Sequence, residues 1–326
     1  MMKITYFHRN IKAGYSINKV TQTIISTIED KEEYYVPCYR FWGLLRNLWF
    51  VYRRRNKEGI NHVTGDIHYC IIALVGCKSV LTIHDAVALD YNNGSWLSKK
   101  IAEWLWFRIP LQLATKVVCI SEETKKSIQR LTKRTDIVVI HNAVDPSFET
   151  VLKKFSEKPL KILIIGTNAN KNIDRTIQAL VGLNCEVTFI GNLSKSQKQL
   201  LSDFNIIYCN KTNLSDKEIV QEYINCDIVS FVSLYEGFGM PIVEANVVGR
   251  PVVASNIPVL REVAGDSAVF IDPYNVDSIR KGIVRLMENP KLWMDCAQRG
   301  LQNANRFSQS IIKLQWMNLY NELIDD

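Results

Sequence analysis

Short runs rich in Val and Ile alternate with longer helical stretches along the whole chain. In the first half, the runs that predict strands span residues 3–7, 79–85, 116–121 and 136–145, and residues 66–74 mix strand and helix signals. Most of these runs are apolar throughout, a pattern typical of strands buried on both faces. Such strands, alternating with helices, predict parallel sheets in an α/β fold.

The alternation restarts after a charged stretch at residues 153–159, which is the predicted boundary between two domains. Beyond it, the predicted strands span residues 161–166, 186–191, 205–209, 227–233, 251–255 and 268–272, and a last helical pattern covers 306–326. A chain of 326 residues is long enough for two domains of ordinary size. We therefore expect two Rossmann-like domains, 1–150 and 151–305, with a ligand in the cleft between them, beyond the carboxyl ends of the strands.

Composition excludes several classes of protein. A chain with 47% hydrophobic and 22% charged residues is globular rather than disordered. No run approaches the roughly 20 apolar residues of a membrane span, and the first residues do not form a secretory signal. The eight cysteines include no C-x-x-C pair, which favours free thiols over disulfides or a zinc site. Asp-x-Asp, a common short carboxylate motif for binding a metal, does not occur. Since neither this motif nor a secretory signal is found, we expect a cytoplasmic protein without a bound metal.

The net charge of +7 is unevenly distributed along the chain. Residues 151–326 hold equal numbers of acidic and basic residues, so the whole excess lies in residues 1–150. An anionic partner is therefore expected at the first half.

The most informative segment is SLYEGFGMPIVEANVVGRPVVAS at residues 233–255. A strand ends there, two glycines flank Phe238, and Pro241 suits the first turn of a helix. Backbone N–H groups at such a helix N-terminus bind anions. Glu236 precedes the turn and Glu244 follows on the first turns of the helix, so both carboxylates are expected to face one ligand.

This segment resembles the signature of family-4 retaining glycosyltransferases of the GT-B fold, also called glycosyl transferases group 1. The resemblance extends to TIHD (82–85), VIHNAVDPSF (139–148), GTNANKN (166–172) and GRPVVASNIPVLREV (249–263). It implies an acceptor-binding first domain, a second domain that binds a nucleotide diphosphate sugar, and a C-terminal helix, 306–326, that crosses back to the first domain.

The resemblance also implies a role for individual residues. Glu236 and His84 would contact the donor sugar, Lys171 would stabilise the departing diphosphate, and Glu244 would bind the ribose hydroxyls. Gly14 would allow the first loop to approach the diphosphate. The other implied donor-binding residues are Thr167, Asn168, Gly237, Phe238, Gly239 and Met240.

Two positions depart from the family pattern. Many relatives carry an Arg a few residues before the lysine, where this chain has GTNAN, so Thr167, Asn168 or an unidentified basic residue must help Lys171. Relatives often have two adjacent glycines in the first loop, where this chain has Ala13-Gly14. The charge stabilisation that a leaving diphosphate needs can still come from Lys171 and a helix N-terminus without a metal.

Residues 38–57 form a basic, aromatic stretch with six basic residues and no acidic one. Apolar residues recur at 41, 44, 45, 48, 49 and 52, which is one face of a helix. With Trp42, Trp49, Arg53, Arg54 and Arg55, this stretch suits an anionic bilayer surface at the inner face of the cell membrane. Residues 95–113 have a similar character. A core helix with a basic outer edge remains the alternative, and no motif indicates nucleic-acid binding.

The predicted function is transfer of a hexose-type sugar, with retention, to a glycan acceptor that is lipid-linked, in surface polysaccharide synthesis. A GT-B sugar-nucleotide epimerase shares the two-domain plan, but not the Glu236–GFGMP–Glu244 segment. A non-catalytic GT-B partner subunit is a third possibility, against which the joint presence of Glu236, Glu244 and Lys171 argues.

Overall fold

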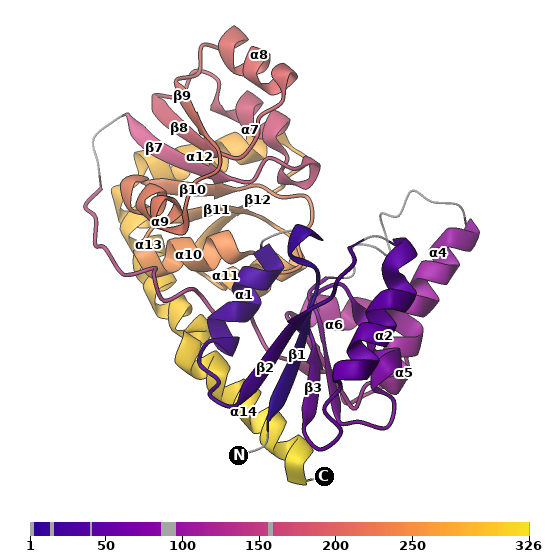
Figure 1. Ribbon diagram of the computed structural model, residues 1–326. Helices are drawn as coiled ribbons and strands as arrows, with labels where there is room; N and C mark the ends of the chain where they lie inside the picture. The colour runs from indigo at the N-terminus through magenta and orange to yellow at the C-terminus, as the bar shows by residue number, and fades with distance from the viewer. Residues whose placement is uncertain (1–2, 14–15, 40, 86–95, 156–158, 326) are drawn as a thin grey trace. The chain divides into compact units, whose positions relative to one another are not determined.

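The computed structural model describes residues 3–13, 16–39, 41–85, 96–155 and 159–325 (Figure 1). It divides into two compact units, which we call the first unit (Met1–Ala143 with Gln309–Asp326) and the second unit (Val144–Ser308). The structural boundary therefore lies between 143 and 144, ahead of the predicted one at 150. The chain enters the second unit at Val144, whose backbone N–H donates to the carbonyl oxygen of Phe307 at 2.9 Å.

The described residues of the first unit form a six-stranded parallel sheet with the order β2-β1-β3-β4-β5-β6. Its strands are β1 (Ile4–His8), β2 (Lys31–Tyr35), β3 (Ile60–Val63), β4 (Ser79–Ile83), β5 (Lys116–Cys119) and β6 (Val138–Val139). The sequence patterns missed β2 and β3. The residues of β2, KEEYY, are largely polar because β2 is an edge strand, and none of its side chains is fully buried. Residues 66–74 contain a 3-10 helix (His68–Leu74), not a strand.

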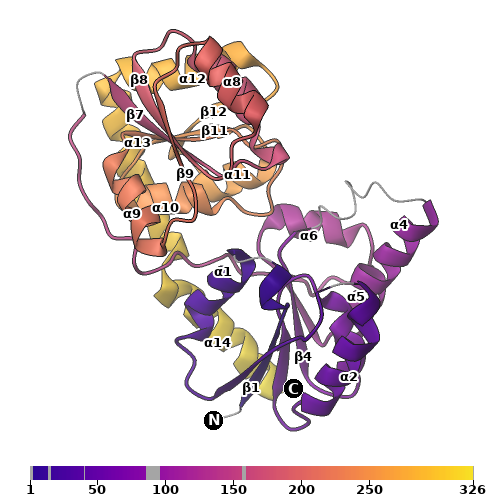
Figure 2. The ribbon, with the colours of Figure 1, turned by 45° about the horizontal axis from the view of Figure 1, so that its top comes forward.

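Helices cover both faces of this sheet (Figures 1 and 2). On one face lie α1 (Ser16–Ile25) and α14 (Gln309–Asp325). On the other lie α2 (Leu44–Arg54), the 3-10 helix, the continuous helical run of α4 (Trp96–Glu103), a π-helical turn (Trp104–Arg108) and α5 (Ile109–Leu113), and α6 (Glu122–Gln129). Ser121 caps α6, as predicted, since its side chain accepts a hydrogen bond from the N–H of Thr124.

The C-terminal helix α14 belongs to the first unit, which confirms the predicted crossing back. Gln309 donates to the carbonyl oxygen of Thr23 at 2.6 Å, and the Tyr320 hydroxyl lies 3.0 Å from that of Tyr6. Tyr320 also contacts His62 Nδ1 at 2.8 Å, and His62 Nε2 contacts Thr82 Oγ1 at 2.7 Å. In this hydrogen-bonded series from Tyr6 through Tyr320 and His62 to Thr82, each buried side chain has a partner, which is the condition for keeping polar side chains in a core.

The second unit forms another parallel sheet, with the order β12-β11-β10-β7-β8-β9 in the described residues. Its strands are β7 (Leu160–Ile165), β8 (Cys185–Ile190), β9 (Tyr208–Lys211), β10 (Ile228–Phe231), β11 (Val252–Ser255) and β12 (Ala268–Ile271). Strand β9 begins three residues later than predicted, because Asn205 has a left-handed φ of 51° and turns the chain after the preceding helix. The predicted α/β fold with two Rossmann-like units is confirmed.

The helices of the second unit follow the predicted alternation, and α8 and α9 begin with capping boxes at Ser194 and Ser215. They are α7 (Ile173–Leu180), α8 (Lys195–Asp203), α9 (Asp216–Asn225), α10 (Met240–Val248), α11 (Pro258–Ala264), α12 (Val276–Glu288) and α13 (Pro290–Ala304). The strand order reverses at the adjacent pair β7 and β10. Loops that leave these two strands at their carboxyl ends flank a topological switch point, where open α/β sheets bind ligands.

Candidate functional site

The loop after β7 folds back so that the Lys171 side chain packs against Gly166, the residue that follows the strand. Gly166 has a φ of +84°, and a Cβ there would lie 2.9 Å from Lys171 Cε, so glycine leaves room for the lysine stem. Asn168 accepts from the N–H of Lys171 at 2.9 Å and starts a short 3-10 helix (Ala169–Lys171). Asn172 then adopts a left-handed φ of 55° before α7. The sequence GTNANKN thus builds one tight turn that fixes the lysine.

Lys171 and Glu236 form an ion pair at the switch point. Lys171 Nζ lies 2.5 Å from Glu236 Oε1, and both side chains are mostly buried, at 16% and 15% exposure. The ammonium also lies 4.5 Å from the centre of the Phe231 ring, a cation–π contact. The structure therefore brings together two predicted site residues that are 65 positions apart in the chain.

Asn170 orients Glu236 and was not found from the sequence. Its amide donates to Glu236 Oε1 at 3.2 Å and to the Tyr235 carbonyl oxygen at 3.1 Å. The Asn170 carbonyl oxygen accepts from the N–H of Leu234 at 2.8 Å. The loops after β7 and β10 are thus joined on both sides of the ion pair. The only available sequence signal was its position, one residue before the lysine.

The segment from Gly237 to Met240 forms the turn that was predicted to bind anions. Gly239 has a φ of +120°, and a Cβ there would lie 2.7 Å from Leu260, so glycine is required. The Phe238 side chain is buried and packs edge-on against Phe307, which leaves only its backbone for a ligand. Helix α10 then begins at Met240 without a side-chain cap, and Pro241 lies in its first turn. Pro241 has no N–H, and the N–H of Ile242 donates to the Gly239 carbonyl oxygen at 3.0 Å, so what this helix end offers an anion is chiefly the positive end of its dipole.

Glu244 lies on α10 and accepts a hydrogen bond from the Tyr223 hydroxyl of α9. Tyr223 is fully buried, and burial, followed by the charge of Glu244, raises the pKa of its hydroxyl well above the ordinary value of 10.0. The hydroxyl therefore stays protonated and donates. Phe148 packs edge-on against the Tyr223 ring with centroids 5.3 Å apart. Tyr223 is a second residue that the sequence did not reveal, because nothing in α9 marks it as facing α10.

His84 follows β4 in the first unit. It is 9% exposed, and its Nε2 atom has no hydrogen-bond partner. Burial lowers the pKa of His84 to about 3, and the nearby charges of His68 and Arg9 lower it further. The imidazole is therefore neutral at physiological pH. Thr82, His141 and Asn142 line a small pocket with it. That His84 contacts the same donor molecule as Glu236 and Lys171 stays a prediction.

The remaining predicted donor residues lie on these loops or outside the described residues. Thr167 is half-buried against Gly191, where a Cβ would lie 2.7 Å from Thr167 Oγ1, while Asn168 is exposed and Met240 half-buried. Gly14 lies outside the described residues. Within the described residues, no three His, Cys, Asp or Glu side chains gather as they would around a metal ion.

The predicted apolar face of residues 41–52 is divided between core and solvent. Leu44, Leu48 and Phe50 pack against the core of the first unit, where Val51 is fully buried. In contrast, Trp42, Leu45, Trp49 and Tyr52 are exposed, at 93%, 78%, 63% and 53%. We call these four residues the α2 stripe, although Trp42 lies in the 3-10 helix (Phe41–Gly43) that directly precedes α2. Neither the core interpretation nor the surface interpretation was right for the whole face.

Arginines stack on the aromatic rings at the end of α2. The guanidinium of Arg53 lies 5.6 Å from the centre of the Trp49 ring, and that of Arg55 lies 3.5 Å from the Tyr52 ring. Arg54 lies 3.9 Å from the Phe50 ring. Cations next to exposed aromatic rings are typical of surfaces that contact anionic bilayers. No helix among the described residues combines the length and the apolar character that a membrane span needs.

Two family models match the chain, one on each half. "Glycosyl transferases group 1" matches residues 154–303, and "Glycosyltransferase Family 4" matches residues 22–148. The chain belongs to the family-4 glycosyltransferases of the GT-B fold. The group 1 match covers the loops that hold Lys171, Glu236 and Glu244, and the family 4 match covers His84 and the α2 stripe.

Two mannosyltransferases are similar to this chain in sequence, and a solved structure is similar to it in fold. O-antigen chain mannosyltransferase B from Escherichia coli is 38% identical over 33% of this chain, which spans 28% of that protein's length. O-antigen chain mannosyltransferase RfbU from Salmonella typhimurium is 26% identical over 86% of this chain and 78% of its own length. Anabaena Alr3699/HepE in complex with UDP-glucose has the same fold, with a TM-score of 0.79 and 17% identity over 99% of this chain and all of its own.

Proposed function

We propose that this family-4 chain is a retaining, metal-independent hexosyltransferase that uses a nucleotide diphosphate sugar as its donor. The observation that carries the proposal is the Lys171–Glu236 pair beside the uncapped N-terminus of α10. It combines a cation, a carboxylate and the positive end of a helix dipole at the switch point of one sheet. The names of the two mannosyltransferases favour mannose as the sugar.

The donor's parts match the chemistry of the residues around the pair. The diphosphate suits the ammonium of Lys171 and the positive end of the α10 dipole, because both favour negative charge and need no metal. The sugar hydroxyls suit Glu236, whose second partner Asn170 holds it in place. The ribose hydroxyls suit Glu244, which Tyr223 orients. In the free protein, Lys171 is paired with Glu236, so the incoming diphosphate takes over one of its contacts.

The proposed reaction replaces the diphosphate with an acceptor hydroxyl on the same face of the sugar. The bond between the anomeric carbon and the diphosphate oxygen breaks, and its electron pair leaves with the diphosphate. The acceptor oxygen bonds to the anomeric carbon and passes its proton to a diphosphate oxygen. Lys171 stabilises the growing negative charge on the leaving group, and the carboxylate of Glu236 favours the oxocarbenium-like carbon.

The acceptor in this proposal is a lipid-linked glycan of a surface polysaccharide, at the inner face of the cell membrane. The α2 stripe and the arginines beside it support membrane contact, because they present aromatic and cationic groups from one helix. The excess of basic over acidic residues lies in the same half of the chain. Contact with an anionic surface would bring the enzyme to an acceptor that cannot leave the bilayer.

A thermal-shift screen against UDP-, GDP- and ADP-sugars, with mannosyl donors included, tests the donor. A bound donor raises the apparent unfolding temperature by mass action. The sugar that binds is then supplied with lipid-linked glycan, and the anomeric configuration of the product is read by NMR. We expect transfer with retention and no effect of a chelator. A sugar nucleotide that is epimerised without acceptor, or an absence of nucleotide binding, would contradict the proposal.

A further inference from the structure

A groove of about 700 Å³ opens on the first unit, between α5 and the segment that follows α6. We call it the α5–α6 groove. Four cations line it, Arg108, Arg130, Lys133 and Arg134, and none of the described residues that line it is acidic. The groove lies before β5 and β6, at the amino ends of the strands. It is therefore separate from His84, which follows the carboxyl end of β4.

Arg134 makes the wall of the groove rigid. Its guanidinium binds both carboxylate oxygens of Asp136, at 2.7 and 2.8 Å. It also donates to the carbonyl oxygens of Leu111 at 2.8 Å and Thr115 at 2.6 Å, which join the end of α5 to the start of β5. These bonds, with one to Ala114, use all five N–H groups of Arg134. Arg134 therefore builds the groove and does not bind a ligand.

The other three cations can bind an anion. Arg108 uses its Nε atom on Glu103, at 2.5 Å, and its Nη1 atom on the Leu131 carbonyl oxygen, at 3.3 Å. Its Nη2 group is left able to donate to a bound oxygen. Arg130 and Lys133 are exposed and make no ion pair with the described residues. A fixed guanidinium with two exposed cations suits a phosphate group, which accepts several charged hydrogen bonds at once.

The surroundings of the groove favour a phosphate at a lipid surface. The helical run that ends at the groove exposes Trp104 and Leu113, at 50% and 40%. The guanidinium of Arg108 lies 5.7 Å from the Trp104 ring, so one residue contacts both the groove and the exposed aromatic. This run and α6 lie on the same face of the sheet as α2 (Figure 2). We propose that the α5–α6 groove binds the phosphate headgroup of an anionic phospholipid.

This inference deepens the membrane contact of the proposed function and gives it a second, independent point. A protein that is held on a bilayer by one amphipathic helix can still rotate about the axis of that helix. A second anchored point, on another helix of the same layer, would fix the orientation of the first unit. Indole rings prefer the headgroup level of a bilayer, which is the depth at which lipid phosphates lie.

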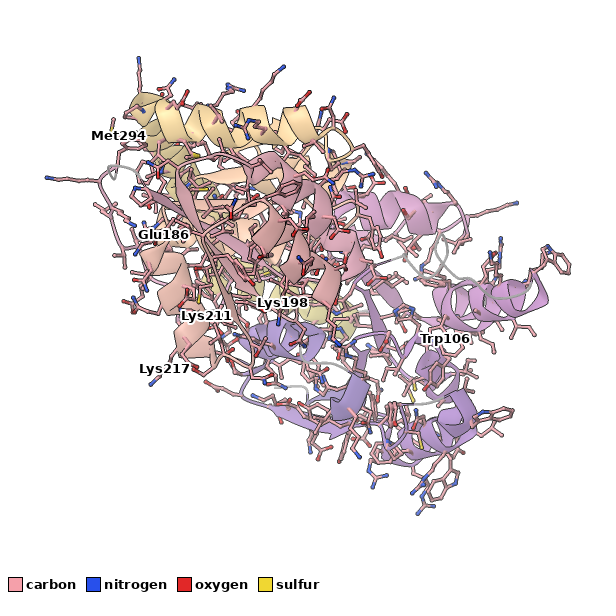
Figure 3. All side chains as sticks on the ribbon, turned by 90° about the horizontal axis from the view of Figure 1, so that it is seen from above. Trp106, Glu186, Lys198, Lys211, Lys217 and Met294 are labelled. Carbon is pink, nitrogen blue, oxygen red and sulfur yellow. The ribbon has the colours of Figure 1, made fainter. Side chains whose placement is uncertain are left out.

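The test measures binding of the full chain to vesicles of phosphatidylcholine, alone or in equal parts with phosphatidylglycerol. The variant is Arg130→Gln/Lys133→Gln. The control is Lys195→Gln/Lys198→Gln on α8 of the second unit, which removes the same charge from two exposed lysines (Lys198 is labelled in Figure 3). We expect the groove variant to bind phosphatidylglycerol vesicles about tenfold more weakly or worse, and the control to bind as the unchanged protein does.

Each other outcome overturns the inference. An equal loss in both variants would mean that net charge, not the groove, drives binding. Titrations with inorganic phosphate and with RNA distinguish other anions. Tight binding of inorganic phosphate, with no stronger binding to vesicles, would assign the groove to a soluble anion. A groove variant that loses RNA binding but keeps vesicle binding would assign the groove to nucleic acid. Nucleotide-sugar binding by thermal shift serves as a separate readout: its absence in the unchanged protein would contradict the proposed function, but would leave vesicle binding as the measure of the groove.

Discussion

The two units have similar sheets but present different groups to solvent. In the second unit, polar side chains form bonded pairs: Lys171 with Glu236 on the loops after β7 and β10, and Tyr223 with Glu244 on α9 and α10. In the first unit, the helices expose Trp42, Trp49, Trp96 and Trp104, while the second unit buries its single tryptophan, Trp293. All five histidines lie in the first unit as well. In the proposed function, the second unit holds one small anionic ligand and the first meets a surface.

The largest expected effect comes from breaking the ion pair of the second unit. Lys171→Ala and Glu236→Ala should each lower kcat for sugar transfer about 100- to 1000-fold, because charge on the departing diphosphate loses its preorganised partner. The control is Lys211→Ala, which breaks another lysine–glutamate pair of 2.6 Å, with Glu222, at the far edge of the same sheet (Figure 3). Unchanged turnover in both site variants would remove these residues from the mechanism.

Acid should weaken the first unit before the second. Burial lowers the pKa of His62 and of His84 to about 3, from 6.5 in the unfolded chain. The unfolded state therefore binds more protons below pH 6.5, and stability is lost as pH falls from there. Each histidine should remove about 1.4 kcal/mol per pH unit, or about 4 kcal/mol for both between pH 6.5 and pH 5.

Hydrogen exchange at pH 7, 6 and 5 measures this loss unit by unit. Protection should fall first in β3 and β4, which carry or precede these histidines. His84→Asn should reduce the slope without abolishing it, since burial also lowers the pKa of His8, His62 and His68. A loss that begins in the second unit, or equal protection at all three pH values, would contradict the expectation.

A smaller effect is expected from Tyr223→Phe. The ring still packs against Phe148, but the buried hydroxyl that holds Glu244 is removed. A hydrogen bond to a charged group contributes about 1.5–3 kcal/mol, so nucleotide affinity should fall roughly 10- to 100-fold. The contact with ribose is the same in ground and transition states, so KM should rise while kcat changes little. An equal fall in kcat would indicate a structural defect, and Tyr274→Phe, at an exposed ring, is the control.

The smallest effect is expected at the α2 stripe. Trp49→Ala should weaken binding to phosphatidylglycerol vesicles several-fold, because one interfacial ring among several is lost. Tyr274→Ala in the second unit is a matched control: both rings are 63% exposed, and both have an arginine stacked on them. If both variants lose binding alike, the stripe has no special part in it.

The sequence predicted the second unit better than the first. Five of its six strands, β7, β8, β10, β11 and β12, begin within one residue of the runs that predicted them, because each carries several apolar residues that are buried in the sheet. In the first unit, β2 is a polar edge strand and β3 is short, with Asn61 and His62 among its four residues. Both lack the apolar run that the patterns require. These polar side chains fit into a sheet because they have bonding partners elsewhere in the chain. Such partners cannot be identified from a short stretch of sequence.

The sequence by itself determined the class of fold, the family and the candidate residues Glu236, Glu244, Lys171 and His84, because these depend on local runs and on short fixed spacings. Only the tertiary structure decided that Lys171 pairs with Glu236, that Asn170 and Tyr223 orient the two carboxylates, and that the α2 stripe is separate from the core face of its helix. Each of these contacts joins residues from different elements, and which elements meet is set by how helices and strands pack.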